Sequence, residues 1–423
     1  MLLQFNFRNF ASFRDDTTLD LTAAKITEYN NHIVEQGNEK ILPVAGIYGA
    51  NASGKSNVIE AFNFMSMYVI ASFNFGGENN TKSGEKESMK PTPFLMDSKS
   101  READSMFEVY FVSDSNDNHK HYNYGFTLNH EGITEEWLSY KSKSSKGDFK
   151  LIFSRKGQNL ELSGISAKSR ENIKVALEKE ALVVSLGAKL RIEKLKKIRD
   201  WFIRNEIADF GHPIENFFLS EKLPENFVDS EKVRNQVLDF FSTFDTSIIG
   251  FEVEEIKAES DQGGTKLRID AVHKMIDSEE TTKIPLKRES AGTLKMFALY
   301  PLLHNVLTQG SVLFVDELNS RLHPLLLRNI LVTFINPETN PNHAQLVFTT
   351  HDAWILNANV LRRDEIWFTE KSDIGISTLY SLADFVDDDG TKIRKDENLE
   401  KNYLLGKYGA IPSLKLLDLN KEE

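Results

Sequence analysis

The chain has 423 residues, no cysteine and a formal net charge of −12. Its length exceeds that of one average domain, so we expect two or more lobes. The lack of cysteine excludes a disulfide framework and cysteine zinc sites, and it suits a reducing cytoplasm. The acidic balance excludes a general nucleic-acid coat, because phosphate binding needs clustered lysine and arginine.

Targeting and membrane segments are not expected. Residues 1–8 lack the basic region and the long apolar core of a signal peptide. The most apolar candidate span, 58–73, is interrupted by Glu60 and Asn63, and no apolar run reaches the roughly 18 residues of a membrane helix. We therefore expect a cytoplasmic protein with no membrane contact.

The first strong motif follows a short strand. Residues 2–7 alternate apolar and polar side chains, which predicts a strand, and the apolar run 43–48 predicts a buried one. A mostly apolar segment of helix length covers 57–72. Between them stands G-x-x-x-x-G-K-S, the pattern of a phosphate-binding P-loop, formed by Gly49, Ala50, Asn51, Ala52, Ser53, Gly54, Lys55 and Ser56, with Asn57 next.

The P-loop pattern carries a specific chemistry. Glycines let the backbone turn its N–H groups toward phosphate oxygens, and the start of the following helix adds a favourable dipole. We expect Lys55 to reach the β- and γ-phosphates of ATP and the Ser56 hydroxyl to hold Mg²⁺. A chance glycine-rich turn is the alternative, and the strand before and the helix after it argue against that.

The middle of the chain changes character twice. Residues 74–92 are polar and glycine-rich, which predicts a loop. Strand patterns at 106–112, 121–128, 132–140 and 149–153 predict an antiparallel meander. Helical patterns follow at 169–182, 187–207 and 229–244. We therefore expect three parts: an N-terminal ATPase lobe with an antiparallel β subdomain at 1–160, a helical insertion at 161–245 and a C-terminal ATPase lobe at 246–423.

The C-terminal part holds a second nucleotide motif. Strands are predicted at 248–253 and 265–270, and from 284 to 370 helices alternate with buried strands as in a doubly wound core. The apolar strand 311–315 ends in Asp316 and Glu317, the Walker B pattern. We expect Asp316 to belong to the Mg²⁺ shell and Glu317 to polarise the attacking water.

Two further candidates are weaker as isolated signals. His351 follows a second buried strand, 345–350, where an imidazole can sense or orient the γ-phosphate. Ser290 and Gly292 open the predicted helix 294–306, and a helix start of this kind is either an anion site or an ordinary N-cap. The residues alone leave those two interpretations of the helix start even.

Taken together, these motifs resemble those of a known family. The P-loop, the Ser290–Thr293 helix start, the Asp316–Glu317 pair and Thr350-His351-Asp352, in this order, resemble ATP-binding-cassette ATPases, and more closely the heads of the SMC/RecF/OLD group. The bacterial abortive-infection ATPases of the AbiL and RloA kind are similar in the strings 289–293, 316–324, 349–352, 361–368 and 406–412. The opening segment 6–13 is also similar to the first strand of such heads.

The resemblance implies a fold and a mechanism. The fold would be an α/β P-loop NTPase of ABC-head type, with a mixed or parallel core sheet, an antiparallel β subdomain and a helical insertion. ATP with Mg²⁺ would be hydrolysed slowly to ADP and phosphate. Two heads would pair head-to-tail as a homodimer or a higher homo-oligomer, with Ser290 and Gly292 of one capping the ATP bound by the other.

The biological role implied is that of a sensor or motor in an anti-phage system, acting with a separate effector protein. The alternatives are an ATP-occupancy switch with little turnover and a RecF-like DNA-binding ATPase in DNA repair. Two departures leave the hydrolysis rate open: the signature reads E-S-A-G-T rather than L-S-G-G-Q, and His323 stands where many cassettes place an aspartate.

Two basic clusters give the chain its only candidate nucleic-acid contacts. The helix at 189–199 carries six basic residues, Lys189, Arg191, Lys194, Lys196, Lys197 and Arg199. The second cluster comprises Lys141, Lys143, Lys146, Lys150, Arg155 and Lys156. We favour solvated surfaces for both, with contact to DNA, RNA or an acidic partner as the alternative.

Overall fold

The computed structural model describes residues 1–75, 90–113, 117–142, 147–212, 214, 219, 223–257, 265–357, 359–387, 390, 392–394 and 397–412. Most of the loop predicted at 74–92 lies outside these residues, as do Lys143 and Lys146. Within the described part of the chain, no helix combines the length and the apolar character needed to cross a bilayer.

The core is a six-stranded sheet with the order β11-β15-β16-β5-β17-β18. Its strands are β11 (Glu206–Asp209), β15 (Val312–Asp316), β16 (Gln345–Thr349), β5 (Val44–Gly49), β17 (Ile366–Lys371) and β18 (Ser377–Ser381). All neighbours pair in parallel except β17 and β18. Every residue of β5, β15 and β16 is buried, which is why these strands read as continuous apolar runs.

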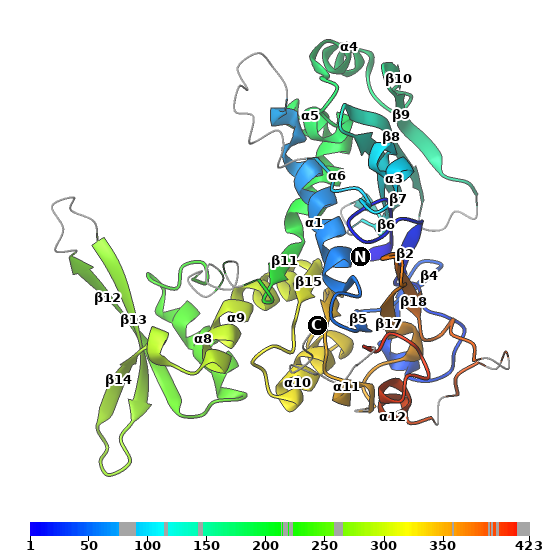
Figure 1. Ribbon diagram of the computed structural model, residues 1–423. Helices are drawn as coiled ribbons and strands as arrows, with labels where there is room; N and C mark the ends of the chain where they lie inside the picture. Colours follow the sequence, from blue (N-terminus) through cyan, green and yellow to red (C-terminus); the bar gives the residue numbers. More distant parts are fainter. Residues whose placement is uncertain are drawn as a thin grey trace, which may run out of the picture.

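Helix α1 (Lys55–Ala71) lies between this sheet and a second one (Figure 1). The ring of Phe62 in α1 stacks on Phe314 of β15 with centroids 4.0 Å apart, and it meets Phe5 of the second sheet edge-on at 5.4 Å. Apolar side chains therefore occupy both sides of α1, and the helix fixes the start of the P-loop against two sheets at once.

The second sheet is antiparallel, with the order β10-β9-β8-β7-β6-β1-β2. Its strands are β1 (Leu2–Arg8), β2 (Thr17–Asp20), β6 (Ser105–Val112), β7 (His121–Asn129), β8 (Gly132–Lys141), β9 (Lys150–Lys156) and β10 (Asn159–Glu161). The run from β6 to β9 is the meander that the strand patterns predicted. Short elements flank it: β3 (Val34–Gln36), β4 (Glu39–Ile41) and α3 (Ser98–Glu102).

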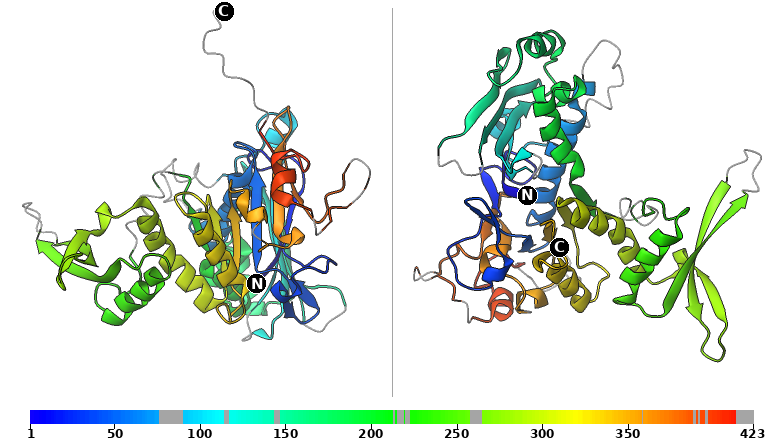
Figure 2. Two further views of the ribbon diagram at one scale, coloured as in Figure 1. Left: turned by 90° about the horizontal axis from the view of Figure 1, so that it is seen from below. Right: turned by 180° about the vertical axis from the view of Figure 1, so that it is seen from behind.

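Helices cover the other face of the core sheet. They are α9 (Ala291–Gln309), α10 (Pro324–Ile335) and α11 (Trp354–Asn357), with α12 (Leu399–Leu404) near the end of the described chain. A three-stranded sheet projects away from the rest of the molecule beside α8 (Figures 1 and 2). The sheet consists of β12 (Ile248–Lys257), β13 (Thr265–Lys274) and β14 (Thr281–Pro285). The helix α8 covers Glu231–Ser242.

The segment predicted as a helical insertion is helical only in part. It contains α4 (Ala167–Ala176), α5 (Val183–Lys189), α6 (Glu193–Arg204) and α8, and also strand β11 of the core sheet. The single helix predicted over 187–207 is wrong, because Arg191 has a left-handed φ of 58° between α5 and α6, and the chain becomes extended at Glu206. The fold class itself is as predicted: a P-loop α/β core with a mixed sheet and an antiparallel β subdomain.

Candidate functional site

The P-loop joins the end of β5 to the start of α1. The helix is preceded by Gly54, which has a φ of 112° that favours glycine. A Cβ atom at Gly54 would also lie 2.7 Å from the hydroxyl oxygen of Ser377. Backbone conformation and close packing therefore both require glycine at this position of the motif.

Lys55 is folded back over the loop. Its Nζ donates hydrogen bonds of 2.9 Å to the carbonyl oxygens of Gly49 and Ala50. Burial lowers the pKa of Lys55 to about 8, and the nearby carboxylates of Asp316 and Glu317 oppose that shift. The ammonium group stands where the loop turns, in the electrostatic field of both acids.

Side chains of β17 and β18 and of the N-terminal segment support the loop from behind. Ser53 Oγ lies 2.6 Å from Thr369 Oγ1, and Ser377 donates to the Ser53 carbonyl oxygen at 2.7 Å. The Asn57 amide donates to Ser12 Oγ at 2.7 Å. The exposed residues of the loop are Asn51 and Ala52, and Ser56 is half-buried. The sequence assigned no role to Thr369 or Ser377, because nothing local links them to the motif.

The two Walker B acids share one organising residue, Thr349 at the end of β16. The Thr349 hydroxyl donates to Asp316 Oδ1 and accepts the backbone N–H of Glu317 at 2.8 Å. Asp316 is buried, and Thr349 is fully buried. Because β16 lies between β15 and β5, this threonine fixes the acids one strand away from the P-loop. The sequence motif predicted the two acids but not Thr349, which holds them in place.

Glu317 adopts a left-handed backbone conformation, with a φ of 51°. Its carboxyl group lies against Gly211, which follows β11: a Cβ at that glycine would stand 3.0 Å from Glu317 Cδ. The turn itself is held by Asp209, whose Oδ1 accepts the N–H of Gly211 at 2.8 Å. The position of the candidate catalytic acid therefore depends on a segment inside the predicted helical insertion 161–245.

His351 lies at the same edge of the sheet, two residues after β16 ends. Its backbone N–H donates to Asn319 Oδ1 at 3.3 Å. Burial and the Lys55 ammonium lower the pKa of His351, and Asp316 opposes the shift. The imidazole is therefore neutral at neutral pH and can both donate and accept a hydrogen bond.

The signature helix start lies beside the turn that follows Walker B. Ser290 caps α9 by accepting the Thr293 N–H at 3.1 Å, and Gly292 approaches the Arg321 carbonyl, which an added Cβ would meet at 3.1 Å. Among the described residues, no hydrogen bond joins Ser290 or Gly292 to the P-loop of the same chain. His323 forms the N-cap of α10, with Nδ1 accepting the Leu325 N–H at 3.2 Å.

One lysine links α9 to the Walker B turn. Lys295 is 3% exposed, and its Nζ donates to the carbonyl oxygens of Glu317 and Leu318 at 2.8 and 2.9 Å and to Ser320 Oγ at 3.2 Å. The same nitrogen lies over the Phe210 ring, 4.3 Å from its centroid. Burial lowers the pKa of Lys295 to about 7. The sequence motifs assign no role to Lys295, whose one signal is a lone charge inside an apolar helix.

The two basic clusters are partly used within the chain. Lys197 pairs with Asp117 at 2.8 Å, and Lys194 donates to the Gly164 carbonyl oxygen at 2.6 Å. Arg155 is 3% exposed and donates to the Ala181 carbonyl oxygen at 2.7 Å, so its assignment to a surface cluster is wrong. Backbone carbonyl oxygens in the segment 178–181 accept hydrogen bonds from its guanidinium group and stabilise it in this buried position.

The fold and these motifs define the class of the protein. A P-loop at the end of β5, a Walker B pair at the end of β15 and a histidine after β16 meet at the carboxyl edge of one parallel sheet, where α/β proteins bind ligands. The fold is that of a P-loop NTPase of ABC-head type.

The comparison with protein families agrees with this class. Residues 44–357 match the family described as "AAA domain, putative AbiEii toxin, Type IV TA system", and the chain belongs to that family. No curated protein sequence matches the chain.

Solved structures give distant similarities that cover most of the chain. An SMC head bound to the C-winged helix domain of ScpA has 12% identity and a TM-score of 0.42, covering 90% of this chain and 97% of that one. The SMC head domain from Thermotoga maritima has 15% identity and a TM-score of 0.39, covering 90% and 98%. RecF with ATP, from the RecFOR pathway, has 14% identity and a TM-score of 0.38, covering 90% and 97%. Similarities this distant do not extend to activity or partners.

Proposed function

We propose that the protein binds ATP with Mg²⁺ and hydrolyses it to ADP and phosphate. The observation that carries this proposal is the arrangement around Thr349, which holds Asp316 and Glu317 one strand away from the P-loop lysine. Phosphoryl transfer needs positioned charge more than covalent chemistry. A lysine, a metal-binding carboxylate and a water-polarising carboxylate at one sheet edge supply that charge.

Each residue has a distinct role in this proposal. Lys55 exchanges its bonds to the Gly49 and Ala50 carbonyls for bonds to the phosphates, which compensate the ammonium better than neutral carbonyls do. Glu317 accepts a proton from the attacking water. Neutral His351 donates a hydrogen bond to the γ-phosphate. The backbone N–H groups of residues 49–57 hold the other phosphate oxygens.

The residues fit a magnesium ion. Asp316 and Ser56 would hold it, and both offer the hard oxygen atoms that Mg²⁺ prefers. In the described residues there is no group of three or more histidine, cysteine or acidic side chains that could form a metal cage. That is the pattern expected where Mg²⁺ is shared between a few protein oxygens, waters and phosphates. When bound, the ion would neutralise charge on the phosphate oxygens.

Pairing of two heads completes the proposed site. Ser290, which is exposed, and Gly292, which is half-buried, stand at the start of α9, a natural anion site that has no hydrogen bond to its own P-loop in the described chain. A second copy turned head-to-tail would bring its Ser290 and Gly292 onto the γ-phosphate. ATP would then stabilise the homodimer, and hydrolysis would release it.

The wider role that we propose is a sensor or motor in an anti-phage system with a separate effector. The AbiL/RloA-like strings in the sequence and the family description, which names a type IV toxin–antitoxin system, support it. The division into lobes at 1–160, 161–245 and 246–423 belongs to the same proposal. A RecF-like DNA-binding role receives less support, because Lys194 and Lys197 of the basic helix already have partners within the chain.

Two variants test the ATPase proposal. Lys55→Ala should abolish ATP binding in equilibrium dialysis. Glu317→Gln should bind ATP normally and release phosphate about a hundredfold more slowly or worse, while exposed Glu338→Gln should match the wild type. If wild type and Glu317→Gln release phosphate at the same slow rate, the protein is an ATP-occupancy switch and not an ATPase.

A separate experiment tests the role in defence. The tagged chain should purify with the product of a neighbouring gene, and phage protection should require both proteins and an intact Glu317. Protection by the chain alone would contradict the separate effector. Tight ATP-dependent DNA binding by the purified chain, lost on charge reversal of Lys194, Lys196 and Lys197, would instead favour the RecF-like role.

A further inference from the structure

The turn that follows Walker B, residues 317–322, is fixed to the body of the chain at three consecutive positions. The backbone N–H of residue 318 donates to the Thr349 carbonyl oxygen at 3.1 Å. The side-chain oxygen of residue 319 accepts the His351 N–H at 3.3 Å, and that of residue 320 accepts the Lys295 ammonium at 3.2 Å. The turn is therefore held both from the end of β16 and from α9.

Arg321 comes directly after these fixed positions and is exposed. Its backbone is left-handed, with a φ of 60°, which is uncommon for a residue other than glycine. Within the described chain its guanidinium group forms no ion pair, although Asp316 and Glu317 stand only a few residues before it. Burial lowers the pKa of Lys295, and the positive charge of Arg321 adds to that shift, so the guanidinium group lies near α9.

Arg321 also lies beside the first turn of α9. A Cβ atom at Gly292 would stand 3.1 Å from the Arg321 carbonyl oxygen and 3.7 Å from Ser290 Oγ. Among the described residues, no hydrogen bond joins Arg321 or Ser290 to the P-loop of the same chain. A surface that brings Ser290 to the nucleotide of a second copy would therefore bring Arg321 with it.

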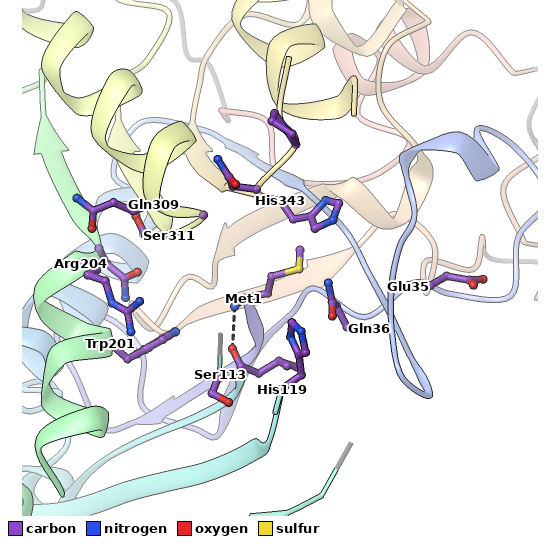
Figure 3. A pocket seen from close by; sticks show the side chains of 15 residues that line it. Met1, Glu35, Gln36, Ser113, His119, Trp201, Arg204, Gln309, Ser311 and His343 are labelled. Carbon is purple, nitrogen blue, oxygen red and sulfur yellow. Dashed lines mark hydrogen bonds between the residues drawn. The ribbon is translucent and has the colours of Figure 1, made fainter. Parts of the chain in front are cut away.

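The cavity drawn in Figure 3 is not an alternative source of positive charge for the nucleotide. It has a volume of about 560 Å³, and Arg204 and His343 belong to its wall. Ser311, also in that wall, precedes β15, whose far end carries Asp316. The two ends of a strand of this length are roughly 15 Å apart. The basic residues of the cavity therefore lie at the opposite edge of the sheet from the P-loop.

We propose that Arg321 is a catalytic residue for the ATP bound by a second copy of the chain, where its guanidinium group contacts the γ-phosphate. Arg321 has this role only in the head-to-tail dimer proposed above, on which the inference rests. Phosphoryl transfer spreads negative charge over the γ-phosphate oxygens, and a guanidinium group can bind two such oxygens with parallel N–H donors. Hydrolysis would then be confined to paired heads, because a single head lacks this charge at its own nucleotide.

Replacing Arg321 gives the first half of the test. Arg321→Asn removes the charge but suits the left-handed turn, which asparagine adopts more readily than most residues. This variant should bind ATP normally and release phosphate at least about a hundredfold more slowly than the wild type. Arg191→Asn is the matched control and should hydrolyse ATP at the wild-type rate. Arg191 is also an exposed arginine with a left-handed φ, of 58°, and it lies between α5 and α6.

Mixing two inactive variants gives the second half, because it separates action on the partner's nucleotide from action on the same chain's. Glu317→Gln is the second variant, since Glu317 serves the nucleotide of its own chain. In a mixed dimer the Arg321→Asn chain supplies the P-loop and Glu317, and the Glu317→Gln chain supplies Arg321, so one of the two sites is complete. Equal amounts, mixed before ATP is added, should recover about a quarter of the wild-type rate, because about half of the dimers are mixed.

The outcomes distinguish this inference from the proposed function. A mixture as inactive as its components, beside an active wild type, overturns the role of Arg321 and leaves the ATPase proposal standing. Wild-type hydrolysis by Arg321→Asn does the same. A wild type that neither hydrolyses ATP nor pairs on it overturns the proposed function and this inference together. If Arg321→Asn does not fold, Arg321→Gly takes its place, because glycine tolerates the same φ.

Discussion

The ammonium nitrogen of Lys295 donates a 2.8 Å hydrogen bond to the carbonyl oxygen of Glu317. Lys295 belongs to α9, whose first turn carries Ser290 and Gly292. In a head-to-tail dimer that turn would touch the partner's nucleotide, while Glu317 serves the nucleotide of its own chain. In the dimer that we propose, this contact would join the two ATP sites through one buried side chain, and Lys295 would act as a positioning residue.

Lys295→Met should lower kcat for ATP about tenfold and leave KM for ATP nearly unchanged. Methionine fills the buried space but leaves the Glu317 and Leu318 carbonyls without their charged donor, a loss of about 1.5–3 kcal/mol. Steady-state phosphate release at varied ATP concentration separates the two constants. Lys274→Met, at an exposed lysine of β13, is the control. A wild-type kcat in Lys295→Met would show that the turn holds its shape alone.

Gly211→Ala should impair hydrolysis without impairing ATP binding. The new methyl group would stand 3.0 Å from Glu317 Cδ, so the carboxyl group must shift by a few tenths of an ångström. Small displacements of a catalytic group cost about tenfold or more in rate. Gly250→Ala, where the nearest atom is Val272 Cβ at 3.7 Å, provides the same substitution without a clash. If Gly211→Ala hydrolyses ATP at the wild-type rate in a single turnover, the reaction does not depend on the carboxyl group of Glu317.

Ser290→Arg should spare ATP binding and abolish ATP-driven pairing. Its long side chain would occupy the space that the partner's γ-phosphate needs at the start of α9. Light scattering after size exclusion, in a Glu317→Gln background that retains ATP, measures the mass directly. Ser278→Arg, in the exposed turn between β13 and β14, should pair normally. If Ser290→Arg still pairs on ATP, Ser290 does not cap the partner's nucleotide, and the P-loop is a nucleotide site within one chain.

Glu136 should make stability depend on pH. Burial raises its pKa to about 7, above the ordinary value of about 4.3, although the N–H groups of Val183 and Val184 oppose the shift. The folded state thus binds more protons than the unfolded state between these values, and stability falls as pH rises through that window. Glu136→Gln has no such loss, so its free energy of unfolding, measured by urea denaturation, should gain on that of the wild type from about pH 5 to about pH 8, by up to about 3 kcal/mol. Exposed Glu135→Gln should show no such trend.

Local sequence was sufficient to predict the parts of the site that depend on backbone chemistry. The P-loop needs its glycines for a turn that only such residues tolerate, and Gly54 indeed has a left-handed φ. Asp316 and Glu317 end a strand buried on both faces, which leaves an unmistakable apolar run. The antiparallel meander was equally visible, because alternation and turn residues are properties of short segments.

The supporting residues could not be predicted, because tertiary contacts define them. Thr349, Thr369 and Ser377 act on the site through hydrogen bonds to residues far away in the sequence. Strand β11 has four residues with little β pattern, and its pairing with β15 overrides the helical pattern of the preceding residues. Arg155 was predicted to be a surface charge. The amino-acid composition does not show that its guanidinium group is buried against backbone carbonyl oxygens.

The place of β5 in the core sheet has a consequence for how the protein is made. Ala45 pairs with Val347 on one side, and Ile47 pairs with Trp367 on the other, most of the chain away. A ribosome therefore releases the P-loop early and its two neighbouring strands late. Until both arrive, β5 is an unpaired apolar strand that must be shielded from aggregation. The nucleotide site that we propose therefore cannot form until β17, which ends at Lys371, has been translated.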